Sequence, residues 1–191
     1  MFPLGVINQS SVASVAEFQS PVGNLSNSNQ TFTATGAGWA RLRVDRPKSG
    51  GKWFFAVELV TIAAGSTGFA IGTSAAAMGS GSGVYIPGAP CELRATSFGV
   101  GKKWIDNTIS NYGAGLSTGD IVGIGYDADT GDVTGYLYSG GSWSSEGVIA
   151  TIAAGSVRRP IIDANLAYTG PSVFTLRPDL APPAGYGNWL T

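Results

Sequence analysis

The sequence feature that most constrains the fold is the stretch 119–138, which has the pattern of a strand, a tight turn and a second strand. Apolar side chains recur at every second position of its first arm, at Val122, Ile124 and Tyr126. The connecting residues 127–132 contain aspartates that hydrogen-bond their own backbone and a glycine that accepts a positive φ. The stretch therefore predicts a β-hairpin, and antiparallel β-sandwiches are built from such hairpins.

The composition of the whole chain favours a single domain made of short strands and many turns. Charged residues form only 12% of the 191 residues, and 29 residues are glycine. The net charge of −1 provides no electrostatic basis for binding nucleic acid or an anionic membrane surface. No run is apolar for long enough to span a bilayer and the N-terminus lacks a secretory signal pattern, so we expect synthesis in a cytoplasm.

The residues that commonly carry catalysis are scarce. The sequence contains no histidine, which excludes Ser-His-Asp or Cys-His catalysis and metal sites ligated by histidine. Its single cysteine, Cys91, rules out an internal disulfide framework and has no neighbouring cation to activate it, so we expect an inert thiol. A carboxylate pair could still hydrolyse glycosides, but acids exposed in a turn make poor general acids. We therefore predict a protein that is not an enzyme and needs no cofactor.

The acids of the predicted turn, Asp127, Asp129 and Asp132, allow two interpretations. Their carboxylates could wrap a calcium ion around the glycine of the turn. However, an EF-hand loop needs a bidentate acid further along, and position 138 is tyrosine. We therefore favour ordinary capping of the hairpin and predict no metal site here.

The run 52–60 is the most strongly β-prone part of the chain, and it is apolar on both faces. A strand of this kind belongs in the centre of a covered sheet. Its one acid, Glu58, is expected to form a salt bridge with Arg41 or Arg43 rather than to act in catalysis. A long loop of small residues is expected at 73–89. Further strands are predicted at 30–35, 39–44, 68–72, 92–100, 103–106, 147–152, 160–166 and 172–176.

The order of these motifs resembles that of the SPRY family, whose fold is a concanavalin-like sandwich. The segment 48–58 is similar to the family's entry strand of glycine, lysine and aromatic residues. The resemblance implies an all-β, two-sheet antiparallel sandwich (a SPRY/concanavalin-like jelly roll) over 22–178, with an N-terminal arm at 1–21 and a Pro/Gly-rich tail at 179–191. One departure is Phe69, where the family often has tryptophan. The other matching segments are 25–27, 33–36, 68–72, 112–113, 119–123, the 127–131 turn and Pro160.

The ending Pro-Pro-Ala-Gly-Tyr at 182–186 resembles the ending of SPRY-like proteins of tailed bacteriophages, as does the charge-poor, Gly/Ser/Thr-rich composition. This resemblance implies a structural protein of the virion, made in the host cytoplasm and used as a head decoration or a tail or fibre component. Its partners would be other virion proteins, in a homo-oligomer or another multi-copy assembly. Apolar side chains outside the predicted sandwich are suited to anchoring it: Phe2, Leu4, Val6, Trp189 and Leu190.

Aromatic residues expected on loops or edge strands are candidates for ligand binding, because flat rings can stack on a sugar face or on a partner's apolar side chains. An alternative function is therefore a carbohydrate- or receptor-binding module that recognises a bacterial surface glycan; an intracellular SPRY adaptor of a host is a third. Each ring could instead pack under a loop, which we expect for Trp104, whereas Trp143 is the better candidate for exposure. The full set is Tyr85, Trp104, Tyr112 and Trp143.

Overall fold

The structure is a computed structural model, and its described residues form strands and turns but no helix. The described part of the chain accordingly contains no helix that could cross a membrane. The described residues are 23–26, 30–34, 39–44, 46–62, 69–74, 91–97, 100–105, 108–165 and 171–191. The strands are β1 (Gly23–Ser26), β2 (Thr31–Ala34), β3 (Trp39–Arg43), β4 (Lys52–Thr61), β5 (Phe69–Ser74), β6 (Cys91–Ser97), β7 (Val100–Ile105), β8 (Thr108–Asn111), β9 (Ile121–Asp127), β10 (Asp132–Ser139), β11 (Ser142–Thr151), β12 (Arg159–Asn165), β13 (Ser172–Leu176) and β14 (Gly187–Asn188).

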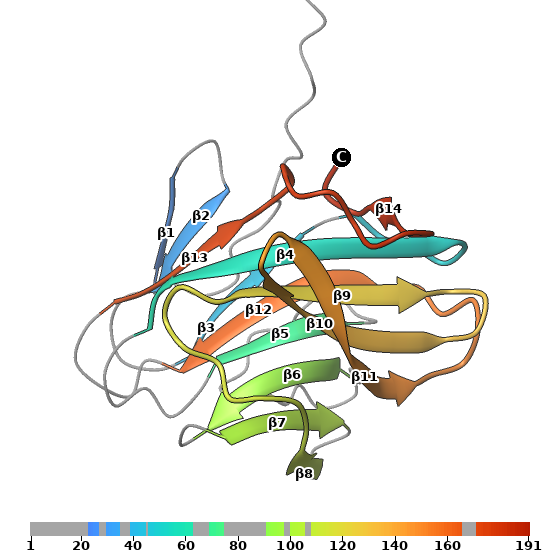
Figure 1. Cartoon of the computed structure of the whole chain (residues 1–191), viewed down its shortest axis with the longest axis horizontal. Coiled ribbons are helices and arrows are strands. Elements are labelled where there is room, and N and C mark those ends of the chain that lie inside the picture. Colours follow the sequence, from blue (N-terminus) through green and yellow to red (C-terminus); the bar gives the residue numbers. More distant parts are fainter. Residues whose placement is uncertain are drawn as a thin grey trace, which may run out of the picture.

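The strands form two sheets that pack face to face (Figure 1). The first has the order β1-β2-β13-β4-β9-β10-β11, with the short β14 added beside β4, and the second has the order β3-β12-β5-β6-β7-β8. All pairs are antiparallel except β14 with β4. The apolar side chains of the two inner faces form one core, so the predicted all-β sandwich of two antiparallel sheets is confirmed.

Strand β4 lies in the middle of the first sheet, between β13 and β9, as its apolar sequence predicts. Phe55, Val57 and Leu59 point into the core and are almost fully buried. Phe54 is also buried, although it belongs to the opposite, outer face of the sheet. The ring of Tyr186, from the C-terminal segment, lies over it at 6.1 Å between centroids. A strand that is apolar on both faces therefore has a cover on both faces.

The predicted hairpin is formed by β9 and β10, and the register pairs Asp132 with Asp127. Gly131 has a φ of +85°, and a Cβ atom at this position would lie 1.9 Å from the carbonyl oxygen of Ile152. Both observations require glycine. The alternating residues of the first arm, such as Ile124, are buried, so the prediction for this stretch is confirmed.

Three strands were not predicted, β1, β8 and β14, and others were predicted with wrong ends. β8 is exposed along its whole length, so it has no apolar alternation to mark it. The first half of β11 is rich in serine and was expected to be a loop. It pairs with β10 because Gly140 and Gly141, with φ of +59° and +84°, form a two-residue turn of the kind that matches the twist of a hairpin. The strand predicted at 92–100 is β6, which ends at Ser97, and the strand predicted at 103–106 is β7, which begins at Val100.

The prediction that Trp189 and Leu190 lie outside the sandwich, free to anchor a neighbour, is wrong. Both side chains are buried in the core. The Trp189 ring stacks on Tyr126 at 5.8 Å between centroids, and its Nε1–H donates to the carbonyl oxygen of Arg46 at 2.7 Å. β13 pairs only with the second half of β4, so the first half has room for β14, which carries Trp189 inward. Proline and glycine prevent a long strand here but not a short one.

We expect Trp189→Ala to lower the free energy of unfolding by about 3–5 kcal/mol, because it removes a large side chain from the core. Urea unfolding at neutral pH measures the effect. Deletion of Thr191 alone, which is exposed, is the matched control and should change stability by less than about 0.5 kcal/mol. A Trp189→Ala variant as stable as the parent protein would contradict the placement of this ring in the core.

Candidate binding surface

A group of aromatic rings lies on the outer face of the first sheet, and we call it the aromatic cluster: Phe54, Tyr136, Tyr138, Trp143 and Tyr186. The Phe54 ring meets Trp143 edge-on at 4.8 Å and Tyr136 at 5.4 Å between centroids. Tyr138 and Trp143 face each other across the β10–β11 hairpin at 4.8 Å. Phe54 is buried beneath the others, whose side chains are all half-buried. The cluster is therefore a continuous aromatic surface that is partly open to solvent.

Two glycines of β9 make room for these rings. A Cβ atom on Gly123 would lie 2.1 Å from Cζ of Phe54, and one on Gly125 would lie 2.9 Å from Cε1 of Tyr186. No side chain of ordinary size fits at either position without displacing a ring. The alternating glycines of this strand therefore let the rings lie directly on the sheet backbone.

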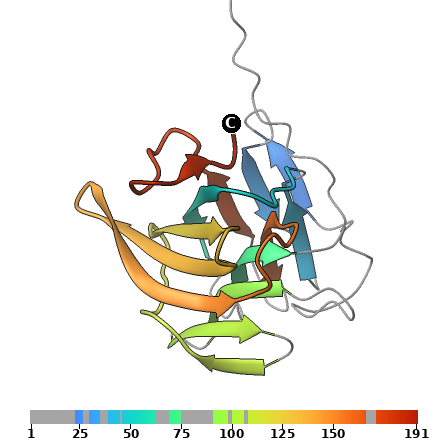
Figure 2. The same ribbon diagram turned by 90° about the vertical axis from the view of Figure 1, so that its right-hand side faces the viewer.

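The C-terminal segment fixes the edge of the cluster. The indole Nε1–H of Trp143 donates to the carbonyl oxygen of Ala181 at 2.9 Å, which joins the tip of the β10–β11 hairpin to the segment that follows β13. Figure 2 shows this hairpin, in orange, curving away from the body of the sandwich with its tip close to the red C-terminal segment. The predicted candidate Trp143 thus lies at a projecting tip, half-buried and held in one orientation.

The curvature of β11 comes from two irregularities in its pairing with β10. The register changes between Val133 and Thr134 and again between Gly135 and Tyr136. Each change leaves one residue of β11 without a partner, as in a β-bulge. The extra residues are Ile149, which is buried in the core, and Glu146, which takes part in ion pairing. The bulges therefore turn two side chains of an edge strand toward the second sheet.

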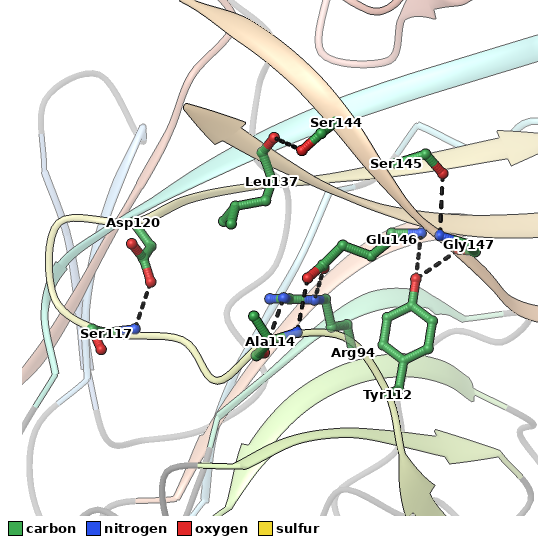
Figure 3. Close-up of polar contacts among 11 residues, drawn as sticks. Arg94, Tyr112, Ala114, Ser117, Asp120, Leu137, Ser144, Ser145, Glu146 and Gly147 are labelled. Carbon is green, nitrogen blue, oxygen red and sulfur yellow. Dashed lines mark hydrogen bonds and ion pairs between the residues drawn. The ribbon is translucent and has the colours of Figure 1, made fainter. Parts of the chain in front are cut away.

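Tyr112 bridges the two sheets at the second bulge (Figure 3). Its hydroxyl donates to the carbonyl oxygen of Gly147 at 2.7 Å and accepts a hydrogen bond from the backbone N–H of Gly135 at 3.0 Å. Burial raises the pKa of Tyr112 to about 12, so the donor proton is kept at any physiological pH. Tyr112 is thus a packed ring, the alternative to ligand binding that the sequence left open.

A second contact between the sheets lies beside it (Figure 3). Nε of Arg94, a fully buried side chain on β6, is 2.5 Å from Oε2 of Glu146. The second guanidinium donor, Nη2, donates to the carbonyl oxygen of Ala114 at 3.2 Å, and the N–H of Ala114 donates to Glu146 Oε1 at 3.0 Å. Lys103 Nζ completes the set by donating to the carbonyl oxygen of Ile149 at 2.9 Å. Side chains of β6 and β7 therefore hold the bulged edge strand.

The turn acids cap the hairpin, which is the interpretation that the sequence favoured. The Asp127 carboxylate forms an ion pair with Lys52 at 2.7 Å and accepts a hydrogen bond from the N–H of Asp129 at 3.1 Å. Asp132 accepts a hydrogen bond from the hydroxyl of Thr151 at 2.6 Å. Among the described residues, no group of three or more His, Cys, Asp or Glu side chains is arranged to hold a metal ion.

The partner expected for Glu58 is wrong. Its carboxylate pairs with Arg177 at 2.8 Å, and Arg177 also binds Asp179 at 2.7 Å. β3, which carries Arg41 and Arg43, belongs to the other sheet. Arg177 follows β13 directly, and β13 lies beside β4, so the sheet order brings these charges together from distant parts of the sequence. Glu58 is engaged in this ion pair on the outer face of the sheet.

The other site residues predicted from the sequence lie away from the aromatic cluster or outside the described residues. Trp104 is half-buried on β7, in the six-stranded sheet and away from the aromatic cluster. Tyr85 lies outside the described residues, as does most of the predicted loop at 73–89. The apolar N-terminal residues Phe2, Leu4 and Val6 also lie outside them. Sequence reasoning missed Tyr138, Tyr136 and Tyr186 as cluster members. The alternation of tyrosines on β10 was the available signal.

Comparison with known proteins identifies the fold. No known family profile matches the sequence, and no curated protein matches it. The SPRY domain of human HERC1 is similar in structure, with 12% identity over 81% of this chain and 91% of that chain, and a TM-score of 0.57. The PSpry domain of TRIM65 has 13% identity over 81% and 83%, with a TM-score of 0.56. Stonustoxin has 14% identity over 85% of this chain but only 26% of its own, with a TM-score of 0.59.

At these identities the likeness concerns the fold alone. The chain is an all-β sandwich of the SPRY-like type, as the order of its sequence motifs implied. A SPRY-like sandwich does not specify an activity by itself. The functional argument therefore rests on the aromatic cluster and the contacts that hold it.

We expect the ion pair of Arg94 and Glu146 to be strongly coupled. Arg94→Met or Glu146→Gln alone should lower the free energy of unfolding by about 3–5 kcal/mol, because each leaves an uncompensated buried polar group. The double variant should lose less than the sum, as a double-mutant cycle in urea would show. Arg177→Met is the control at a more exposed pair and should cost about 1 kcal/mol or less. Simple additivity at Arg94 and Glu146 would contradict a direct buried interaction.

The capping role of Asp127 predicts a dependence of stability on pH. The hydrogen bond from Lys52 holds the pKa of Asp127 below its ordinary value. A depressed folded-state pKa stabilises the fold above the unfolded-state pKa, and the gain disappears as pH falls through the lower folded value. We therefore expect Asp127→Asn to be less stable than the parent at pH 7, with the difference shrinking below about pH 4.

Urea unfolding between pH 7 and pH 2 measures this difference. Asp129→Asn, at an exposed position of the same turn, is the matched control and should change the free energy of unfolding by less than about 0.5 kcal/mol. A difference between Asp127→Asn and the parent that stayed constant down to pH 2 would show that the carboxylate charge has no part in capping.

Proposed function

We propose that the chain is a non-catalytic binding module that serves as a structural protein of a bacteriophage particle, as a head decoration or as part of a tail or fibre. The observation that carries the binding role is the aromatic cluster. Half-buried rings of tyrosine and tryptophan supply rigid contact area at low entropic cost. The cluster is held by the C-terminal segment and by the contacts of the second sheet, so it is pre-organised for a partner.

The assignment to a virion is supported by the sequence. The phage-like ending at 182–186 and the charge-poor composition are the features that favour it. The ring of Tyr186, within this ending, is a member of the aromatic cluster. The ending that resembles phage proteins and the proposed binding surface are therefore parts of the same structure.

The way in which the module attaches to the particle differs from the arrangement that the sequence suggested. Trp189 and Leu190 belong to the core, so the C-terminal residues do not serve as an anchor. The proposal for attachment therefore relies on the apolar N-terminal arm at 1–21, with Phe2, Leu4 and Val6 as contact residues. The proposed location is the virion, in several copies, with other virion proteins as partners.

The role in the particle is tested by mass spectrometry of purified virions of the phage that encodes the chain, with its copy number measured against the major capsid protein. We expect the protein to be present, in hundreds of copies for a head decoration or in threes or sixes up to a few dozen copies for a tail or fibre component. Absence from the particle would reject the proposal.

Attachment is tested in the same system. Deletion of residues 1–21 should abolish rebinding of the purified protein to particles that lack it, while the circular dichroism spectrum stays that of a folded β-protein. Full rebinding without these residues would place the attachment surface on the sandwich instead.

A further inference from the structure

The tip of the β10–β11 hairpin combines two rings in a defined arrangement. Tyr138 and Trp143 are direct partners across the hairpin, and their planes are inclined at 56° with 4.8 Å between centroids. Both lie on the outer face, next to the two-residue turn Gly140–Gly141, and both are partly open to solvent. The tip of this hairpin lies close to the C-terminal segment (Figure 2). A ligand can therefore approach them without entering the core.

The Trp143 ring does not have to be ordered by a ligand. Its Nε1–H is bonded to the carbonyl oxygen of Ala181, and its edge rests on Phe54. A Cβ atom on Gly123 would lie 3.0 Å from Cζ3 of the indole, so the ring sits on the bare backbone of β9. Little rotamer entropy remains to be lost when a ligand covers the exposed part of the ring.

The polar side chains of the hairpin tip are neutral hydroxyls. Four serines lie at the tip, and all are exposed. Residues 133–145 contain no Asp, Glu, Lys or Arg. The next acid, Glu146, is turned inward and paired with Arg94. Ser145 lies on the same face of β11 as Trp143 and offers an uncharged hydroxyl there, whereas Ser139, Ser142 and Ser144 alternate to the opposite face of the hairpin.

The half-buried state of the rings favours a small polar ligand over a protein. A stable protein interface buries about 800 Å² on each partner and has an apolar centre. The large apolar side chains that are most exposed in the described part of the chain are Val60, Ile109, Val148 and Val157, and none belongs to the aromatic cluster. A sugar needs only one apolar ring face for its C–H groups, and neutral partners for its hydroxyls.

We infer that Tyr138, Trp143 and Ser145, on one face of the hairpin tip, form a binding site for a neutral saccharide. The absence of a cation from the tip directs the site toward uncharged hexose or N-acetylhexosamine units and away from sulfated or sialylated ones. This inference rests on the proposed function, because it names the ligand class of the same aromatic cluster. Of the four aromatic residues that the sequence suggested for glycan binding, the proposed site keeps only Trp143.

The first experiment uses the full chain on an array of neutral oligosaccharides, with sulfated and sialylated oligosaccharides on the same surface. Binding to at least one neutral oligosaccharide is expected, without preference for the charged ones. The best binder is then titrated into ¹⁵N-labelled protein, which has five tryptophan indole N–H signals. We expect the Trp143 signal to move most, because its ring lies at the site.

Two variants test the residues. Trp143→Ala and Tyr138→Ala should each weaken the affinity by roughly tenfold or more, since each removes one stacking surface. Val157→Ala is the matched control, because Val157 is an exposed apolar residue beyond the opposite end of β11, and its affinity should be unchanged. If a cluster variant fails to fold, the Trp143 signal of the unmodified protein still decides the question.

The saccharide site would be overturned by any of three results: no binding to neutral saccharides, binding only to charged ones, or neutral binding that leaves the Trp143 signal unmoved. These results are separable from the proposed role in the particle. A protein that is found in virions and rebinds to them, but ignores saccharides, retains the structural role and loses the saccharide site. A protein that binds neutral saccharides through Trp143 but is absent from virions retains the saccharide site and loses the structural role.

Discussion

The double coverage of β4 is the constraint on which the rest of the first sheet depends. Phe55 points into the core and Phe54 points away from it, and both are buried. The second sheet can cover only one of these faces, so the other needs material from elsewhere in the chain. The C-terminal segment supplies it: Tyr186 packs over Phe54 on the outer face, and Trp189 enters the core beside Phe55. The aromatic cluster therefore exists because the chain folds back over its own central strand.

Contacts with other parts of the chain also explain the shape of the hairpin that carries the cluster. β11 is an edge strand, and edge strands expose backbone groups to pairing with other chains. Here its carbonyl groups at Gly147 and Ile149 are occupied by Tyr112 and Lys103, and the N–H of Gly147 donates to the hydroxyl of Ser145. The Tyr112 hydroxyl also accepts from the N–H of Gly135, so it bridges β10 and β11 where their direct pairing is interrupted. These contacts hold the bulges that bend the hairpin, and the bent hairpin presents the rings.

The parts of this structure that sequence patterns predicted are the local ones. Alternation located the β9–β10 hairpin, and a doubly apolar run located the central strand, because both signals lie within a few neighbouring residues. The pairing of Glu58 with Arg177 and the burial of Trp189 depend on which strands become neighbours, and this information is not local. β11 was half missed because its first residues are serine, which has little β-propensity of its own. Its pairing is imposed by the two-glycine turn and by ring contacts across the hairpin.

The distribution of charge limits the kinds of partner that the aromatic cluster can attract. In the described part of the chain, ion pairs join Lys52 to Asp127, Arg94 to Glu146, Arg158 to Glu92, and Arg177 to Glu58 and Asp179. Each pair satisfies charges within the domain, and the net charge of the whole chain is −1. Long-range steering of a charged partner has little to act on in such a molecule. The recognition that we propose at the hairpin tip therefore depends on shape, on ring faces and on neutral hydrogen bonds, and binding there should be insensitive to salt.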